Sequence, residues 1–276
     1  RGVRSTREYQ PERTMTDWPT GARAAVAFTF DFDAEEIWIG EDPANAERPG
    51  ILSQGTYGAK VAMPLVLDVL RRREVRASFF IPGRVAERHP GRVEEIVAAE
   101  HEIAHHGYTH TSPTKLSREE EEAELVKGRE VLEGFGVEVR GYRSPSWDFS
   151  EHTLSLLETH GFAYSSNLMD DIRPYRHDGS SVAEVPIQWI LDDAPHFWFD
   201  PATWTKKIST VEEVRSIWEK EVLGIVELGG SAVVTCHPQI IARPGRVGFL
   251  EEFIAFVQGL DGVWIATTAE IAEHAS

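Results

Sequence analysis

The stretch AVAFTFDFDAEE, residues 25–36, combines the pattern of a buried strand with a cluster of carboxylates. Apolar residues run up to Phe30 as in a buried strand, and then Asp31 and Asp33 appear two positions apart. Because residues two apart in a strand point to the same face, both carboxylates should project together from the end of this strand. Two bare carboxylates repel, and a cation that takes one as a ligand would hold the other ionised nearby. The alternative interpretation is a capping or solvated aspartate pair.

Outward from this stretch, short β-rich runs alternate with amphipathic segments. Strands are predicted at residues 22–30, 75–81, 101–106, 139–144, 162–166, 181–187, 231–237 and 262–267. Helices are predicted at 60–73, 92–100, 117–135, 150–161, 210–229 and 248–260, where apolar positions recur at three and four. The alternation predicts an α/β fold, a distorted (β/α) barrel of seven or eight units with parallel strands inside and helices outside. An open doubly wound sheet is the alternative, but no Gly-rich dinucleotide fingerprint follows the first strand.

Length and composition indicate one folded domain. The 276 residues suit one large domain or two small ones, and a hydrophobic content of 41% is enough for a core. We expect the Arg-rich residues 1–17 to be an N-terminal extension and residues 18–276 to form a single domain. A net charge of −17 argues against nucleic acid and anionic membranes as partners. No apolar run reaches the length of a membrane span, no secretion signal is visible, and the lone Cys236 rules out an intrachain disulfide. We therefore expect a cytoplasmic protein without a membrane partner.

Two long stretches, residues 34–56 and 189–210, show neither helical nor strand periodicity and are predicted to be irregular. The second is dense in tryptophan and phenylalanine. Loops of this length in a compact domain are usually functional or disordered, and this composition argues against disorder. It would either roof a pocket or form a subunit contact.

A cluster of histidines lies in HEIAHHGYTHTSP, residues 101–113. His106 and His110 are four apart, and we expect them on one helical turn just past a strand, where both imidazoles reach a single metal ion. Two histidines and one carboxylate form the ligand set of a catalytic metal site with open positions. His105 should point elsewhere, and His101 should lie at the other end of the strand.

Two further strand ends carry polar residues. In GYRSPSWDFS, residues 141–150, Arg143 could hold a carboxylate bidentately and Trp147 could form a pocket wall, although such residues in a loop are often structural. In SAVVTCHPQ, residues 231–239, His237 closes a buried-type strand and could act as a general acid. Cys236 alternates to the other side of that strand and is interpreted as a core residue.

Together these motifs resemble the polysaccharide deacetylase family, also called carbohydrate esterase family four or the NodB-homology group. The resemblance runs from about residue 20 to 270. FTFDFD is similar to the first motif of the family, HHGYTH to the second, RSPSW to the third and TCHP to the last. The spaced Asp-Phe-Asp departs from the adjacent aspartates of most members. It resembles an intracellular branch that contains peptidoglycan deacetylase-like, allantoinase-like and cyclic imide hydrolase-like proteins.

The resemblance implies a role for each motif residue. Asp33, His106 and His110 would bind one divalent metal ion, zinc first, with cobalt, nickel or manganese as alternatives. Asp31 would be the general base, Arg143 would orient it, and His237 would protonate the leaving nitrogen. The substrate-binding residues are predicted to be Trp147, Pro145 and Tyr108. Either Asp192 or Asp193 could be the carboxylate partner of His237.

The implied function is metal-dependent hydrolysis of a carbon–nitrogen bond, foremost the deacetylation of an N-acetylated sugar or polysaccharide of the peptidoglycan or chitin type. The alternative is a cytoplasmic hydrolase of a small cyclic imide, ureide or linear amide that uses the same site. A non-catalytic barrel that binds a sugar or a metal is a third hypothesis. The expected partners are a small-molecule or oligosaccharide substrate and, as in the branch it resembles, further copies of the same chain.

Overall fold

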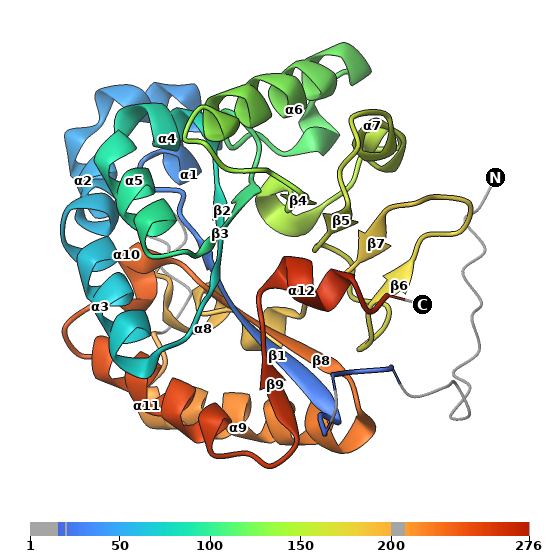
Figure 1. Ribbon diagram of the computed structural model, residues 1–276. Helices are drawn as coiled ribbons and strands as arrows, with labels where there is room; N and C mark the ends of the chain where they lie inside the picture. The colour runs from blue at the N-terminus through green and yellow to red at the C-terminus, as the bar shows by residue number, and fades with distance from the viewer. Residues whose placement is uncertain (1–15, 20, 200–207, 276) are drawn as a thin grey trace.

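The computed structural model describes residues 16–19, 21–199 and 208–275 (Figure 1). The strands are β1 Ala24–Asp31, β2 Ser78–Ile81, β3 Glu102–His105, β4 Gly141–Tyr142, β5 Tyr164–Ser165, β6 Tyr175–Arg176, β7 Ala183–Glu184, β8 Ser231–Cys236 and β9 Val263–Ile265. The helices are α1 Glu36–Ile39, α2 Pro49–Tyr57, α3 Met63–Arg73, α4 Gly83–Arg88, α5 Pro90–Ala98, α6 Arg118–Glu133, α7 Thr153–Thr159, α8 Ala194–Phe197, α9 Val211–Leu228, α10 Pro238–Ile241, α11 Val247–Gln258 and α12 Thr268–Ala272. The predicted N-terminal extension falls mostly outside the described residues.

The strands form one curled sheet in the order β6-β7-β5-β4-β3-β2-β1-β8, with β9 paired to the first half of β1. All pairs are parallel except β6 with β7. Between β7 and β8 the barrel is closed by an irregular segment, which forms a single parallel bridge from Asp192 to Thr235. The prediction of a distorted (β/α) barrel is confirmed, and the antiparallel β6 is an addition to it.

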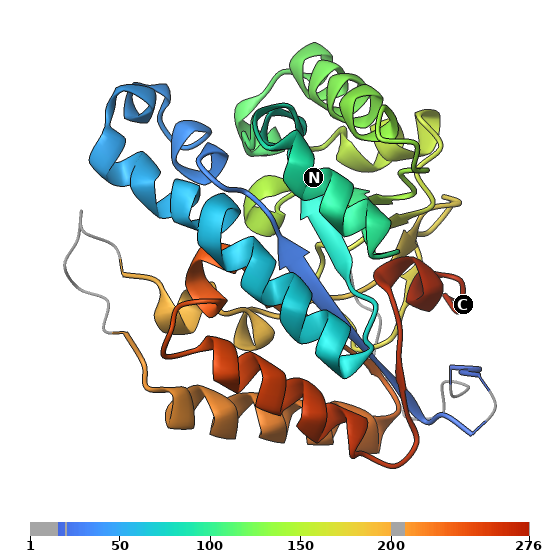
Figure 2. The ribbon, with the colours of Figure 1, turned by 60° about the vertical axis from the view of Figure 1, so that its left-hand side comes forward.

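Helices surround the sheet, and the long α3, α9 and α11 run side by side along one flank (Figures 1 and 2). Each of the six predicted helices is present. The capping boxes that begin α6 and α9 pair Ser117 with Glu120 and Thr210 with Glu213, which satisfies the first free backbone N–H groups of each helix. None of the helices within the described ranges combines the length and the apolar character needed to cross a bilayer.

The alternation along β1 explains why an apolar strand ends in carboxylates. Phe28, Phe30 and Phe32 point outward into the core between sheet and helices. The alternate residues line the barrel interior, which changes from small and apolar at Ala27 through a hydroxyl at Thr29 to the carboxylates. The strand therefore carries its chemistry to its carboxyl end, where parallel barrels build their sites.

The opposite end of the barrel is closed by α12. The first residues of β2 and β3, Ser78 and Glu102, accept hydrogen bonds from the backbone of Thr268 and Ala269 in this helix. Tyr164 from β5 donates to the same Glu102 carboxylate at 2.6 Å. This polar network closes one end and leaves the carboxyl ends of the strands as the open face.

The prediction that residues 34–56 are irregular is wrong. This stretch forms α1, a 3₁₀ helix at Pro43–Glu47 and α2, and it continues through a π-helical turn at Gly58–Ala62 into α3. In the second stretch, Trp189–Leu191 is a 3₁₀ helix and α8 follows it. The rest of that stretch, from residue 200 to 207, lies outside the described residues.

Candidate active site

Asp31 and Asp33 lie where β1 ends, buried and on the same face of the strand. Arg143, which follows β4 and is fully buried, donates from Nη1 to Asp31 Oδ1 at 2.7 Å. Burial alone would raise the pKa of Asp31, but the Arg143 guanidinium, together with the nearby His106 and His237, lowers the pKa below its usual value. Asp31 is therefore ionised and held in one orientation.

The guanidinium of Arg143 does not grip Asp31 bidentately, so that prediction is wrong. Its Nε and Nη2 donate to the backbone oxygen and the hydroxyl of Ser166, at 3.2 and 3.1 Å. Nη1 also donates to Thr29 Oγ1 at 2.9 Å, and the group lies 3.9 Å from the ring centre of Phe80. One arginine thus ties β1 to β4 and to the segment after β5.

His106 and His110 follow β3 on a loop and not on a helical turn, which corrects the prediction. Gly107, at φ +76°, turns the chain, and His110 itself has φ +58°. The carboxylate of Glu124 in α6 accepts hydrogen bonds from the backbone N–H groups of Tyr108 and Thr109, at 2.8 and 2.7 Å. The loop nevertheless brings the two imidazole rings to a centroid distance of 5.0 Å.

The ring of His106 has a defined orientation. Its Nδ1 lies 2.7 Å from the backbone oxygen of Arg143, so this nitrogen carries the proton and Nε2 presents its lone pair to the site. Burial lowers the pKa of His106 to about 4 and that of His110 well below its usual value, so both rings are neutral near pH 7. Neutral imidazole is the form that ligates a metal ion.

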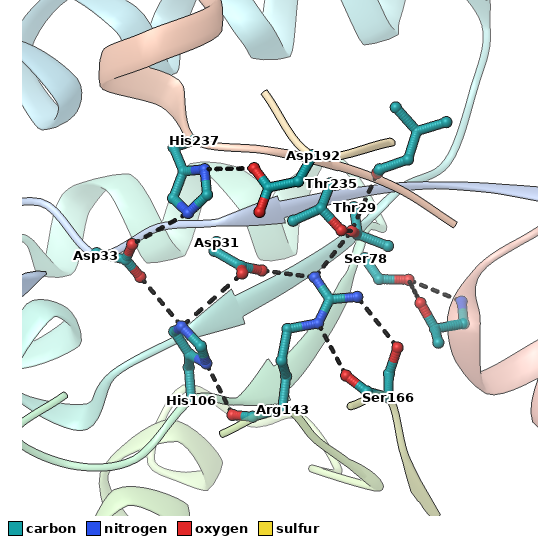
Figure 3. Close-up of polar contacts among 12 residues, drawn as sticks. Thr29, Asp31, Asp33, Ser78, His106, Arg143, Ser166, Asp192, Thr235 and His237 are labelled. Carbon is teal, nitrogen blue, oxygen red and sulfur yellow. Dashed lines mark hydrogen bonds and ion pairs between the residues drawn. The ribbon is translucent and has the colours of Figure 1, made fainter. Parts of the chain in front are cut away.

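Asp33 completes a three-sided group. Its Oδ1 lies 3.4 Å from His106 Nε2 (Figure 3). The same oxygen lies 3.6 Å from His110 Nε2, and the ligand atoms of the three residues are all within 4.8 Å of one another. Both Asp33 oxygens are buried and accept no hydrogen bond. Burying an ionised carboxylate without a hydrogen-bond partner costs free energy. Burial accordingly raises the pKa of Asp33 to about 8. The two nitrogens and the orphaned carboxylate fit a divalent cation, which would supply the missing partner.

His237 follows β8 and faces Asp33 from the other side, with 3.7 Å between His237 Nε2 and Asp33 Oδ2 (Figure 3). Its Nδ1 lies 2.7 Å from Asp193 Oδ1, and its backbone N–H donates to Asp193 Oδ2 at 3.0 Å. Burial lowers the pKa of His237, but the charges of Asp193 and Asp192 outweigh it and raise the pKa well above its usual value. His237 is therefore a protonated imidazolium with Nε2–H facing the site.

The carboxylate partner of His237, left open by the sequence, is Asp193. Asp192 is farther, at 3.7 Å from Nδ1, and its Oδ1 accepts the backbone N–H of Ala194 instead. Asp192, Asp193 and His237 are also close enough to hold a metal ion. Asp193 and the His237 ring are already hydrogen-bonded to each other. This second group therefore has fewer free ligand atoms for a cation than the first.

A cavity of about 340 Å³ joins these groups; it is lined by Asp31, Asp33, His106, His110, His237 and Trp147, among others. Trp147 stacks on Trp189 with ring centroids 4.1 Å apart and planes 16° apart. Trp189, Lys115 and Glu41 also line the cavity and were not predicted. For Trp189, the aromatic density of residues 189–210 was the available signal.

Two predicted substrate-binding residues do not line the cavity. The Tyr108 ring packs against Gly83 in α4, and its hydroxyl donates to Glu87 at 3.1 Å, so it points away from the site. Pro145 is buried at the start of the turn that presents Trp147. As predicted, His105 points away, toward the backbone oxygen of Leu125 in α6, and His101 lies at the other end of β3.

Comparison with known proteins agrees with this architecture. A family model described as polysaccharide deacetylase matches residues 54–165. The peptidoglycan deacetylase of Helicobacter pylori is 28% identical over 283 residues, covering 90% of this chain and 94% of that protein.

Among solved structures, a Mycobacterium smegmatis protein described as a polysaccharide deacetylase is 42% identical to this chain. The two structures align with a TM-score of 0.91 over 95% of this chain and 93% of that one. The Puue allantoinase shares the fold, with a TM-score of 0.82 over 97% of each chain at 19% identity. The chain therefore belongs to the polysaccharide deacetylase family of amide hydrolases.

Proposed function

We propose that this protein is a metal-dependent deacetylase of N-acetylated sugars, of the kind found in peptidoglycan or chitin. The observation that carries the proposal is the convergence of Asp33, His106 and His110 on one point, with both Asp33 oxygens buried and unpartnered. These three residues would hold one divalent ion, zinc first. When bound, such an ion acts as a Lewis acid on the substrate carbonyl and lowers the pKa of a coordinated water to about 7.

The protein supplies a base and an acid beside that ion. Asp31, kept ionised by Arg143, takes a proton from the attacking water. His237 carries its proton on Nε2, because Nδ1 is engaged with Asp193, and gives it to the departing nitrogen. The carbon–nitrogen bond breaks, and the products are acetate and the free amine. Positioned acid–base groups of this kind contribute about 10²–10⁴-fold to the rate.

The stacked Trp147–Trp189 pair gives the cavity a flat wall, which suits the apolar face of a sugar ring. Trp189 is 45% exposed, so a chain of sugars could extend past it toward solvent. This exposure favours an oligosaccharide over a ligand that is fully enclosed.

A second candidate function keeps the same residues and changes the substrate to a small cyclic imide, ureide or linear amide. The observation that favours it is the α1–α2 segment, which packs so closely over the histidine loop that a Cβ on Gly40 would lie 2.4 Å from the backbone oxygen of His110. That segment narrows one side of the cavity, which has a volume of about 340 Å³.

One experiment tests both candidates. The purified protein is depleted of metal, restored with zinc, cobalt, nickel or manganese, and assayed against chitooligosaccharides, peptidoglycan fragments, succinimide and hydantoin. Acetate release from the sugars that depends on restored metal supports the deacetylase. Turnover of the rings alone would replace it by the second function, and activity that is indifferent to metal would contradict both.

A further inference from the structure

A second cavity of about 360 Å³ lies behind the wall of the active site. It shares no lining residue with the catalytic cavity, but the same three segments separate the two. In α1, Ile37 lines the catalytic cavity and Trp38 lines the second one. The chain after β8 likewise presents His237 to one cavity and Gln239 to the other. In α8, Ala194 lines the catalytic cavity and Phe197 lines the second one. The short helix α10 contacts both α2 and α8.

The lining of the second cavity contains a buried amide with no partner. Gln239 is only 7% exposed, and neither its Oε1 nor its Nε2 makes a hydrogen bond. Leaving a buried polar atom unpaired costs its lost hydration, so such groups are uncommon in native proteins. Because the amide offers a donor and an acceptor side by side, its complement is a group with an adjacent acceptor and donor, such as an imide or carboxamide edge.

Two arginines of the same cavity have no carboxylate partner. Arg243 lies 4.2 Å from the ring centre of Tyr57, and Arg246 lies 4.5 Å from that of Phe197. Within the described ranges neither forms an ion pair, although the chain carries 45 acidic residues against 28 basic ones. Asp193, the carboxylate that acts on Arg246 at longer range, is already bonded to His237. Unpaired guanidinium groups beside a cavity are suited to a carboxylate or phosphate.

The remaining wall is aromatic. Trp38 and Trp198 lie with ring centroids 5.3 Å apart and planes tilted by 32°, and both face this cavity. Indole rings bury flat apolar surface well. Arg246 Nη1 donates to the backbone oxygen of Ile240 at 2.9 Å, which holds this guanidinium beside the cavity without neutralising its charge. The aromatic wall, the unpaired amide and the two guanidinium groups thus describe three different parts of one ligand.

We propose that this cavity binds a small planar anion, a flat ring with a hydrogen-bonding edge that carries a carboxylate or a phosphate. The ring lies against Trp38 and Trp198, its edge pairs with Gln239, and its anionic group meets Arg243 and Arg246. The proposal does not rest on the proposed catalytic function, because no residue of the catalytic cavity takes part in it.

Calorimetric titration of the full chain tests the proposal with chosen probes. Orotate has a flat ring, an imide edge and a carboxylate; uracil has the ring and the edge only; inorganic phosphate has the charge only. We expect orotate to bind at least about tenfold more tightly than uracil or phosphate, since a hydrogen bond to a charged group contributes about 1.5–3 kcal/mol. Uridine monophosphate in place of orotate distinguishes a phosphate ligand from a carboxylate ligand, and tight binding of either supports the site.

Variants locate the binding. Arg243→Gln and Gln239→Glu should each weaken orotate binding about tenfold or more, the second by placing a negative charge beside the anion. Arg215→Gln is the matched control, because Arg215 also lies over an aromatic ring, that of Phe249, but outside the cavity. Thermal unfolding checks that each variant is folded. If Gln239→Glu does not fold, Arg243→Gln alone still tests the proposal.

Two results would overturn the proposal. The first is that none of the probes binds at millimolar concentration. The second is that orotate or uridine monophosphate binds the folded Arg243→Gln protein as tightly as it binds the unaltered chain and the Arg215→Gln control. Neither result bears on whether the metal site hydrolyses an amide, which the substrate panel decides separately.

Discussion

Two histidine–carboxylate groups face each other across the catalytic cavity, and they differ in what their carboxylates touch. Asp33 accepts no hydrogen bond, and the imidazoles of His106 and His110 beside it are neutral. Asp193 is fully engaged by the ring and backbone of His237, which is protonated. The same two residue types therefore form the proposed cation site on one side and the proposed proton donor on the other. The difference comes from hydrogen bonding, since the carboxylates of both groups are buried to the same extent.

The largest expected effect comes from removing the unpartnered carboxylate. Asp33→Asn should abolish stoichiometric metal binding and lower kcat/KM by about a thousandfold or more, because the ion contributes several kcal/mol to transition-state stabilisation. Metal analysis of the purified variant and steady-state kinetics check this. Burial raises the pKa of metal-free Asp33 to about 8, so above pH 8 the metal-free variant should also resist urea at least as well as the metal-free parent, because a neutral amide then replaces a buried charge. A variant that keeps both its metal and its activity would remove the basis of the comparison.

The other side of the cavity is tested by a matched pair of neighbouring carboxylates. Asp193→Asn should lower kcat by about 10–100-fold, because the direct hydrogen bond that orients His237 is lost. Asp192→Asn should have a smaller effect, since Asp192 lies 3.7 Å from the same ring nitrogen and bonds elsewhere. Both variants should retain the metal ion. Loss of the metal in Asp193→Asn would show that the two groups act as one.

The smallest expected effect is on the free energy of unfolding. It tests whether burial alone, away from the site, keeps an imidazole neutral. His101 is buried outside the site, accepts the backbone N–H of Ala77, and has its pKa lowered to about 4 by burial. The unfolded chain binds a proton near pH 6.5, so stability is present above that pH and is lost as the pH falls toward 4. At pH 5 the loss from this residue is about 1–2 kcal/mol.

In His101→Asn the amide oxygen can still accept that backbone N–H. The variant should therefore lose less stability than the parent between pH 7.5 and pH 5, measured by urea unfolding at each pH. Equal losses in the two proteins would show that His101 does not titrate on unfolding in this range.

The sequence predicted the strands well because alternation of apolar and polar residues survives even in short strands such as β4 and β5. It missed α1, which at four residues is too short to show a helical period, and α2, whose nine residues include Pro49, Gly50 and Gly55. It also missed β6, a two-residue strand whose only partner is β7.

Within the site, the sequence identified residue types better than their geometry. The spacing of His106 and His110 suggested a helical turn, but a positive φ at Gly107 and hydrogen bonds to Glu124 impose a loop. The loop still brings the two imidazole rings together, as a helical turn would. Asp192 and Asp193 are adjacent, so no sequence pattern says which one reaches His237. That choice depends on the bridge to β8, a contact between segments more than forty residues apart.

The number of strands that pair with β1 determines which part of the domain unfolds first. This strand pairs with β2, β8 and β9, more partners than any other strand of the sheet, and Asp31 is its last residue. Its backbone amides should be among the slowest in the molecule to exchange with deuterium, opening only when the whole domain unfolds. The segment that carries Asp193 meets β8 through a single bridge and should open at much lower cost. Gentle heating would then separate Asp193 from His237, the proposed proton donor, while Asp31 at the end of β1 keeps its position.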